Sequence, residues 1–214
     1  MSSGTRKGWA PARFPSDAAA AERLREWIEA EGGGLDAIAL VLDGADISHG
    51  DFSESWFSDA KLRNVRLVDS ELYRSDMQGA DMSGSDLSGC SLVRVNLDDA
   101  ILRDATLDGA NLVKASLYDV DAAGAKCRGT QFAGSSLLGV DFRGADLSDS
   151  TFDRNSFRVT LDQETRLVGA SGSVIGPVVL VHETSSHELG GQELEEWITS
   201  RGGRIQVVSP ARQR

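Results

Sequence analysis

Histidine and cysteine are the side chains through which this chain could most readily do chemistry, and they are few. The sequence holds three histidines and two cysteines. His182 and His187 lie in the string HETSSHE, where they stand one residue farther apart than the histidines of the zinc-binding pattern H-E-x-x-H. Residues i and i+4 share a helix face, whereas residues i and i+5 do not. The string therefore does not predict a helical zinc site, and we assign no metal to it.

No other pattern predicts catalysis. The serines are numerous, but nothing in the sequence joins one of them to a histidine and an aspartate, as an activated nucleophile would require. No glycine-rich phosphate loop opens a helix. We expect no catalytic residue, no cofactor and no enzyme activity, so the function should lie in what the surface presents to a partner.

The elements that would position a functional side chain follow a period of five residues from 45 to 159. A large apolar residue is expected at every fifth position from 47 to 157, and 21 of these 23 positions hold Leu, Ile, Phe or Met. A helix repeats its apolar face every 3.6 residues and a strand every 2, so neither explains this period. Each unit is too short to bury its own apolar residue, and the units must stack to form a core.

The units resemble those of the pentapeptide-repeat family, whose pattern is Ala, Asp or Asn, Leu and two variable residues. A-D-M-S-G (80–84), A-N-L-V-K (110–114) and A-D-L-S-D (145–149) match it closely. The resemblance implies an all-β solenoid, a right-handed quadrilateral β-helix with four units per coil. With coils ~4.8 Å apart, residues 45–159 would make a rod roughly 28 Å long.

The irregular units are neighbours. Ala122 and Cys127 replace large apolar residues, while Val120 is larger than usual for its position. Residues 120–130 are therefore interpreted as a repacked coil, with a bend or a partner site as the alternative. Cys90 and Cys127 are expected to be buried small hydrophobes without a disulfide.

The flanking segments predict caps. We expect a flexible arm at 1–16, a helix and an apolar capping strand at 17–44, the β-helix at 45–159, and a transition with a strand–helix–strand module at 160–214. Ser16 or Asp17 would begin the first helix and Gly32 would end it. The strings LREWIEAEGG (24–33) and LEEWITSRGG (194–203) are alike, either by chance or because both segments cap the rod.

The C-terminal module has two open roles, as a cap or as the joint of a homodimer. The candidate contacts for either role are Leu194, Trp197, Ile198 and Val207.

Composition limits the partners. The chain has 33 acidic and 22 basic residues and a net charge of −11, which argues against direct binding to nucleic acid or to an anionic membrane. The N-terminus has no apolar signal region, and no segment is long and apolar enough to span a bilayer. We expect a cytoplasmic protein.

Outward charges fall into rows when the units are sorted by a 20-residue coil. One face presents five aspartates against Arg158 alone: Asp59, Asp76, Asp98, Asp99 and Asp119. The next face aligns Arg74, Arg94 and Lys114 at one equivalent position in successive coils. Trp56 stands outward where Asp or Asn is usual, which makes it either a contact hot spot or a residue that packs against the N-terminal helix or arm.

The resemblance suggests a partner. Several pentapeptide-repeat proteins of this size are dimeric DNA mimics that protect a type II topoisomerase, DNA gyrase, and so confer antibiotic or toxin resistance. The acidic row agrees with such a role. The alternative is a scaffold or regulatory adaptor that holds another protein through the rod and the C-terminal module.

Overall fold

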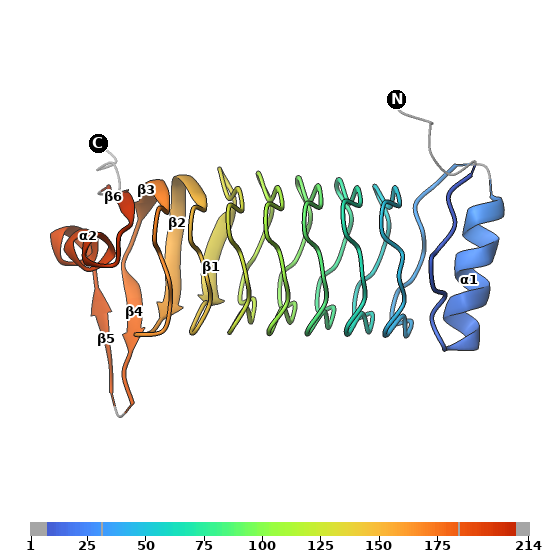
Figure 1. Cartoon of the computed structure of the whole chain (residues 1–214), viewed down its shortest axis with the longest axis horizontal. Helices are drawn as coiled ribbons and strands as arrows, with labels where there is room; N and C mark the ends of the chain where they lie inside the picture. Colours follow the sequence, from blue (N-terminus) through green and yellow to red (C-terminus); the bar gives the residue numbers. More distant parts are fainter. Residues whose placement is uncertain (1–7, 31, 184, 209–214) are drawn as a thin grey trace, which may run out of the picture.

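The computed structural model describes residues 8–30, 32–183 and 185–208 as a rod with a helix at each end (Figure 1). Its elements are α1 (Ala18–Glu29), β1 (Ser136–Asp141), β2 (Thr151–Leu161), β3 (Ser171–Ile175), β4 (Val178–Val181), β5 (Ser186–Leu189), α2 (Gly191–Ser200) and β6 (Arg204–Val207). Between α1 and β1 the rod is built from isolated parallel bridges and turns rather than from continuous strands.

Each coil contains 20 residues. Parallel bridges join residue i to residue i+20, as in the series Asp36, Trp56, Asp76. Backbone hydrogen bonds follow the same register, since the N–H of Leu62 donates to the carbonyl of Asp81 at 2.7 Å. Four units of five residues therefore make the four sides of a coil, and we number the positions of a unit from first to fifth, as in Ala80 to Gly84.

The third positions fill the interior of the rod. Their large side chains are almost fully buried, and at Ala122 and Cys127 the exposed fraction is still only 2%. The 20-residue register runs unbroken from Ile101 through Asp121 to Asp141, and Phe142 follows Ala122 in the next coil. Residues 120–130 are thus a repacked coil without a bend.

Polar first residues satisfy backbone carbonyls inside the rod. The hydroxyl of Thr130 donates to the carbonyl of Leu107 at 2.7 Å, and the thiol of Cys90 lies 2.8 Å from the carbonyl of Leu67 in the same arrangement. Both cysteines are free and buried. Burial raises the pKa of Cys90 to about 12, so this thiol is not nucleophilic at neutral pH.

Fifth residues turn the chain in a left-handed backbone conformation. Non-glycine residues there have φ values near +55°, as at Asp119 (+52°), a conformation that costs most L-residues about 1 kcal/mol or more. The Asp119 carboxylate covers Gly139 of the next coil so closely that a Cβ on that glycine would collide with it.

The β-helix begins earlier than predicted. Residues 35–44, expected as a capping strand, instead form two repeat units with Ala37 and Leu42 as buried third residues. Asp36 bridges to Trp56, and Val41 bridges to Lys61. These units resemble a strand in sequence because their first and third residues are both apolar.

Helix α1 lies across the first coil (Figure 1). The Asp17 carboxylate caps the helix by accepting from the N–H of Ala20 at 2.9 Å. Leu24 and Trp27 are buried, and the Trp27 ring stacks on Phe52 with 5.1 Å between ring centres. The helix thereby covers apolar side chains that would otherwise meet water at the rod's open end.

The predicted flexible arm is ordered over residues 8–16. Trp9 packs edge-on against Trp27 and Phe52, and its indole N–H donates to the carbonyl of Ser48 at 2.9 Å. Arg13 forms an antiparallel bridge with Asp46. These contacts hold the segment against the first coils, whereas residues 1–7 of the predicted arm lie outside the described residues.

The pairing register shifts by one residue near the end of the repeat, between β1 and β2 and again between β2 and β3. Asp162 stands where the period expects an apolar residue, but the pairing of β1 with β2 shifts by one residue between Leu138 and Asp141. This shift places Leu161, which is fully buried, above Phe142. Leu167 then fills the layer above Leu147.

The C-terminal segment continues the sheet of the rod and is not a separate module. Strands β3 and β4 pair in parallel with β2, and β6 pairs in parallel with β3. Strand β5, an additional strand between the two predicted ones, pairs antiparallel with β4. Helix α2 closes this end, with Leu194 and Ile198 fully buried (Figure 1).

A charge in the third position should destabilise the rod severely. Leu97 is fully buried, and Leu97→Ala should lower the free energy of unfolding by about 2–5 kcal/mol. Leu97→Asp should cost more because its carboxylate would be buried without a partner. Urea denaturation of both variants measures the difference, and equal costs would contradict this account of the interior.

The close approach of the Asp119 carboxylate to Gly139 should have a measurable effect on stability when a Cβ is added to the glycine. Gly139→Ala should lower stability more than Gly109→Ala, because both residues have positive φ but a Cβ at Gly109 would meet nothing within 4 Å. Adding Asp119→Gly should remove the excess cost, in a double-mutant cycle read by thermal unfolding. An excess that persists in the double variant would show that Asp119 is not its cause.

Candidate protein-binding surface

The predicted acidic row lies on one side of the rod, which we name the Trp56 face. It consists of the sides whose third residues are 57, 77, 97, 117 and 137. Asp76 is in a second position and Asp98 is in a fourth position. The three remaining aspartates occupy fifth positions, all with positive φ: Asp59, Asp99 and Asp119.

Two of these carboxylates also brace the rod. Asp76 accepts from the side-chain amide of Asn96 at 3.1 Å, and Asp98 accepts from the hydroxyl of Ser116 at 2.6 Å. Asp98 accepts as well from the N–H of Tyr118 at 2.9 Å. All of these donors are neutral, so the negative charges on this face persist.

Several acidic residues on other sides are paired with arginine, whereas others there, such as Asp104 and Asp149, are in no ion pair with a described residue. The Arg128 Nε donates to the Asp108 carboxylate at 3.0 Å, and Arg143 and Asp141 form a comparable pair. Burial alone would raise the pKa of Asp108, but the hydrogen bonds and charge of Arg128 outweigh it, and the pKa lies below its ordinary value. Among the residues that the structure describes, no ion pair involves the five aspartates of the Trp56 face.

Two half-exposed aromatic side chains lie on the same face. Trp56 and Tyr118 are each 49% exposed. Trp56 stands in the bridge series between Asp36 and Asp76, and the rings that pack on Trp27 of α1 are those of Trp9 and Phe52. Sequence reasoning missed Tyr118, although an aromatic residue in an outward fourth position was a readable signal.

The predicted basic row also lies in one column, on the side that we name the Arg94 face, whose third residues are 52, 72, 92, 112 and 132. Arg74, Arg94 and Lys114 occupy fifth positions with φ between +56° and +60°. No ion pair found in the described part of the chain includes them. The Arg74 guanidinium lies over the Tyr73 ring, 5.2 Å from its centre.

Two of the four candidate dimer or cap contacts pack inside the end of the rod. Leu194 and Ile198 are buried against the end of the rod, so they cannot meet a second copy. Trp197 is half-buried beneath the Arg201 guanidinium, which lies 3.8 Å from its ring centre. The N–H of Val207 donates to the Glu195 carboxylate at 3.0 Å, which blocks part of the β6 edge against strand pairing.

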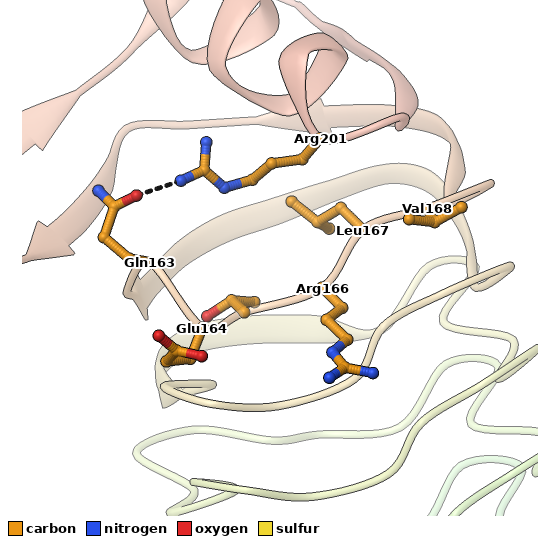
Figure 2. A pocket seen from close by; sticks show the side chains of 7 residues that line it. Gln163, Glu164, Arg166, Leu167, Val168 and Arg201 are labelled. Carbon is orange, nitrogen blue, oxygen red and sulfur yellow. Dashed lines mark hydrogen bonds between the residues drawn. The ribbon is translucent and has the colours of Figure 1, made fainter.

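A shallow open hollow of about 250 Å³ lies between α2 and the last coil (Figure 2). The Arg201 side chain donates to the Gln163 amide oxygen across its rim, whereas Arg166 points away from Arg201. Leu167 lies in its wall. Because these polar groups do not converge on one point, we assign no ligand to the hollow.

The histidines of the HETSSHE string face each other across the turn between β4 and β5. The rings of His182 and His187 are stacked with 5.2 Å between their centres. Within residues 8–30, 32–183 and 185–208, no group of three or more His, Cys, Asp or Glu side chains could hold a metal ion. The same residues contain no helix with the length and apolar character needed to cross a membrane.

The comparisons with known proteins concern the repeats. The family described as pentapeptide repeats matches in eight copies over residues 51–89, 80–117, 90–126 and 115–154. No curated protein sequence matches the chain.

One solved structure shares the fold, and two others are similar to this chain with TM-scores below 0.5. HetL of the cyanobacterium Nostoc sp. strain PCC 7120, a pentapeptide-repeat protein involved in heterocyst differentiation regulation, is 21% identical over 71% of this chain and 81% of its own, with a TM-score of 0.51. Rfr23 of the cyanobacterium Cyanothece 51142 is 20% identical over 61% and 89%, with a TM-score of 0.38. QnrB1, a plasmid-mediated fluoroquinolone resistance protein, is 17% identical over 82% and 94%, with a TM-score of 0.33.

The 20-residue coil, the apolar third positions and the eight matched copies agree with one another. The chain belongs to the pentapeptide-repeat family.

Proposed function

We propose that this protein acts without catalysis, by binding another protein through the Trp56 face, and that it does so as a DNA mimic on a type II topoisomerase such as DNA gyrase. The observation that carries the proposal is the set of five carboxylates that form no ion pair with another described residue, beside the half-exposed rings of Trp56 and Tyr118. Competition with DNA for the enzyme would lower its sensitivity to fluoroquinolones or toxins. This activity requires the protein to share the cytoplasm with the enzyme.

The density of negative charge on the Trp56 face is close to that on one side of a DNA duplex, which supports the proposal. Asp59 and Asp119 are three coils apart, which is roughly 14 Å along the rod. Duplex DNA carries roughly eight phosphate charges over that length, about half of them on any one side. Five carboxylates over the same length present a similar charge to a flat basic surface.

A scaffold or adaptor remains the alternative. It would use the C-terminal residues as well as the rod, where Leu194 and Ile198 are buried but Val168 and Val179 are exposed. A binding Trp56 face would serve an adaptor equally well. The experiment therefore has to identify the partner and the face separately.

The test is DNA supercoiling by gyrase together with displacement of duplex DNA from the enzyme. The variant Asp59→Asn, Asp99→Asn, Asp119→Asn removes three charges, and Asn tolerates positive φ. We expect it to raise the protein concentration needed for half-displacement at least five-fold, because the attraction to the DNA-binding surface weakens.

The matched control is Asp69→Asn, Asp104→Asn, Asp149→Asn. These aspartates occupy the same position of the repeat, also with positive φ, but on other faces. The control should change half-displacement less than two-fold. Equal effects of the two variants would contradict binding through the Trp56 face, and unchanged supercoiling at micromolar wild-type protein would contradict the topoisomerase as the partner.

A further inference from the structure

The fifth position of the repeat is occupied differently on the Arg94 face. On the other three sides, the described fifth residues with positive φ are Gly, Asp or Asn, apart from Ala39 and His49. On the Arg94 face long charged side chains take this position in five coils: Glu54, Arg74, Arg94, Lys114 and Arg154.

Local stability does not explain these side chains. Glycine adopts positive φ without strain, and Asn and Asp adopt it more readily than Arg or Lys. None of the four cations forms an ion pair with another described residue that would offset the strain. Arg74 does lie over the Tyr73 ring, 5.2 Å from its centre, but a strained position without an ion pair is still one at which a functional role is to be sought.

An apolar column runs beside the cations. Tyr73, Val93 and Val113 precede the three successive cations and are half-buried. The second position is neutral beside Arg94 and Lys114, at Ser91 and Asn111, and acidic beside Arg74, at Glu71. The Arg94 face therefore presents a basic strip and an apolar strip side by side.

We propose that the Arg94 face binds an amphipathic helix of a protein partner, with an acidic stripe on the cations and an apolar stripe on the valines. Arg74 and Lys114 are two coils apart, roughly 10 Å. Acidic residues at i, i+3 and i+7 of a helix span roughly 10.5 Å, at 1.5 Å per residue. In a strand, side chains on the same side are about 6.7 Å apart, which does not match the spacing of about 4.8 Å between coils.

Charge complementarity favours this occupant over other polyanions. The chain carries a net charge of −11, and the Trp56 face, with its five aspartates, adjoins the Arg94 face. DNA or an anionic membrane would extend beyond the narrow basic strip and meet those carboxylates. A single helix covers the strip alone. This site is independent of the function proposed for the Trp56 face.

The experiment measures the affinity of the full chain for a labelled synthetic helix by fluorescence anisotropy at 50 and 300 mM salt. The probe has Glu at i, i+3, i+7 and i+10 with Leu on the adjoining stripe, and a peptide with the same composition in scrambled order is the comparison. The variant Arg74→Asn, Arg94→Asn, Lys114→Asn should bind the probe at least ten-fold more weakly, and its Tm should equal or exceed that of the wild type because strain is relieved.

The matched control, Lys61→Gln, Lys126→Gln, Arg158→Gln, removes the same charge from other faces and should retain the wild-type affinity. Equal binding of the ordered and scrambled peptides would overturn the proposal, as would equal losses in the two variants. Tighter binding of duplex DNA or phosphatidylserine vesicles than of the probe would assign the strip to a different polyanion. A lower Tm in the Asn variant would show that the cations stabilise the rod, which contradicts the argument from strain.

Discussion

Everything in this molecule depends on the backbone ladder that joins residue i to the coil 20 residues later. The ladder satisfies the main-chain donors and acceptors of each side only through the neighbouring coils. It therefore demands a turn with positive φ at the fifth position and an apolar side chain at the third. The second and fourth positions carry few such demands, and most of the variation in charge and in exposed aromatic rings is found there and at the fifth position. Binding surfaces can thus change with little effect on the interior.

The period of five was enough to predict the coil and its interior, because the third residue is buried in every layer. The ends were harder to predict. Leu40 and Leu42 belong to a repeat unit but alternate like a strand, and only the bridge from Val41 to Lys61 separates the two interpretations. The one-residue shift that buries Leu161 in place of Asp162 arises from strand pairing, which a periodic count does not contain. Trp9 docks on rings that are distant in sequence, so the composition of the arm did not say which residues it would meet.

Part of the surface was also readable from the sequence. Alignment by 20 residues placed the aspartates and the three cations in rows, as the structure has them. The alignment did not say which charges are neutralised, although Asp108 and Arg128 stand 20 residues apart and form such a pair. The C-terminal contacts depended on how α2 is rotated about its axis. The rotation turns Leu194 and Ile198 inward, and no pattern within a single helix distinguishes a cap from a dimer surface.

Because a helix closes each end of the rod, the number of coils between the two helices can vary. Helix α1 touches only the first coils and α2 only the last ones, while each inner coil meets others of its own kind. Adding or removing 20 residues in the middle therefore changes the length by one coil, about 4.8 Å, and leaves both ends intact. A number of residues that is not a multiple of 20 would rotate the faces against each other and break the rows of charge. The spacing between coils is fixed, whereas the number of coils, and with it the length of the rod, can vary.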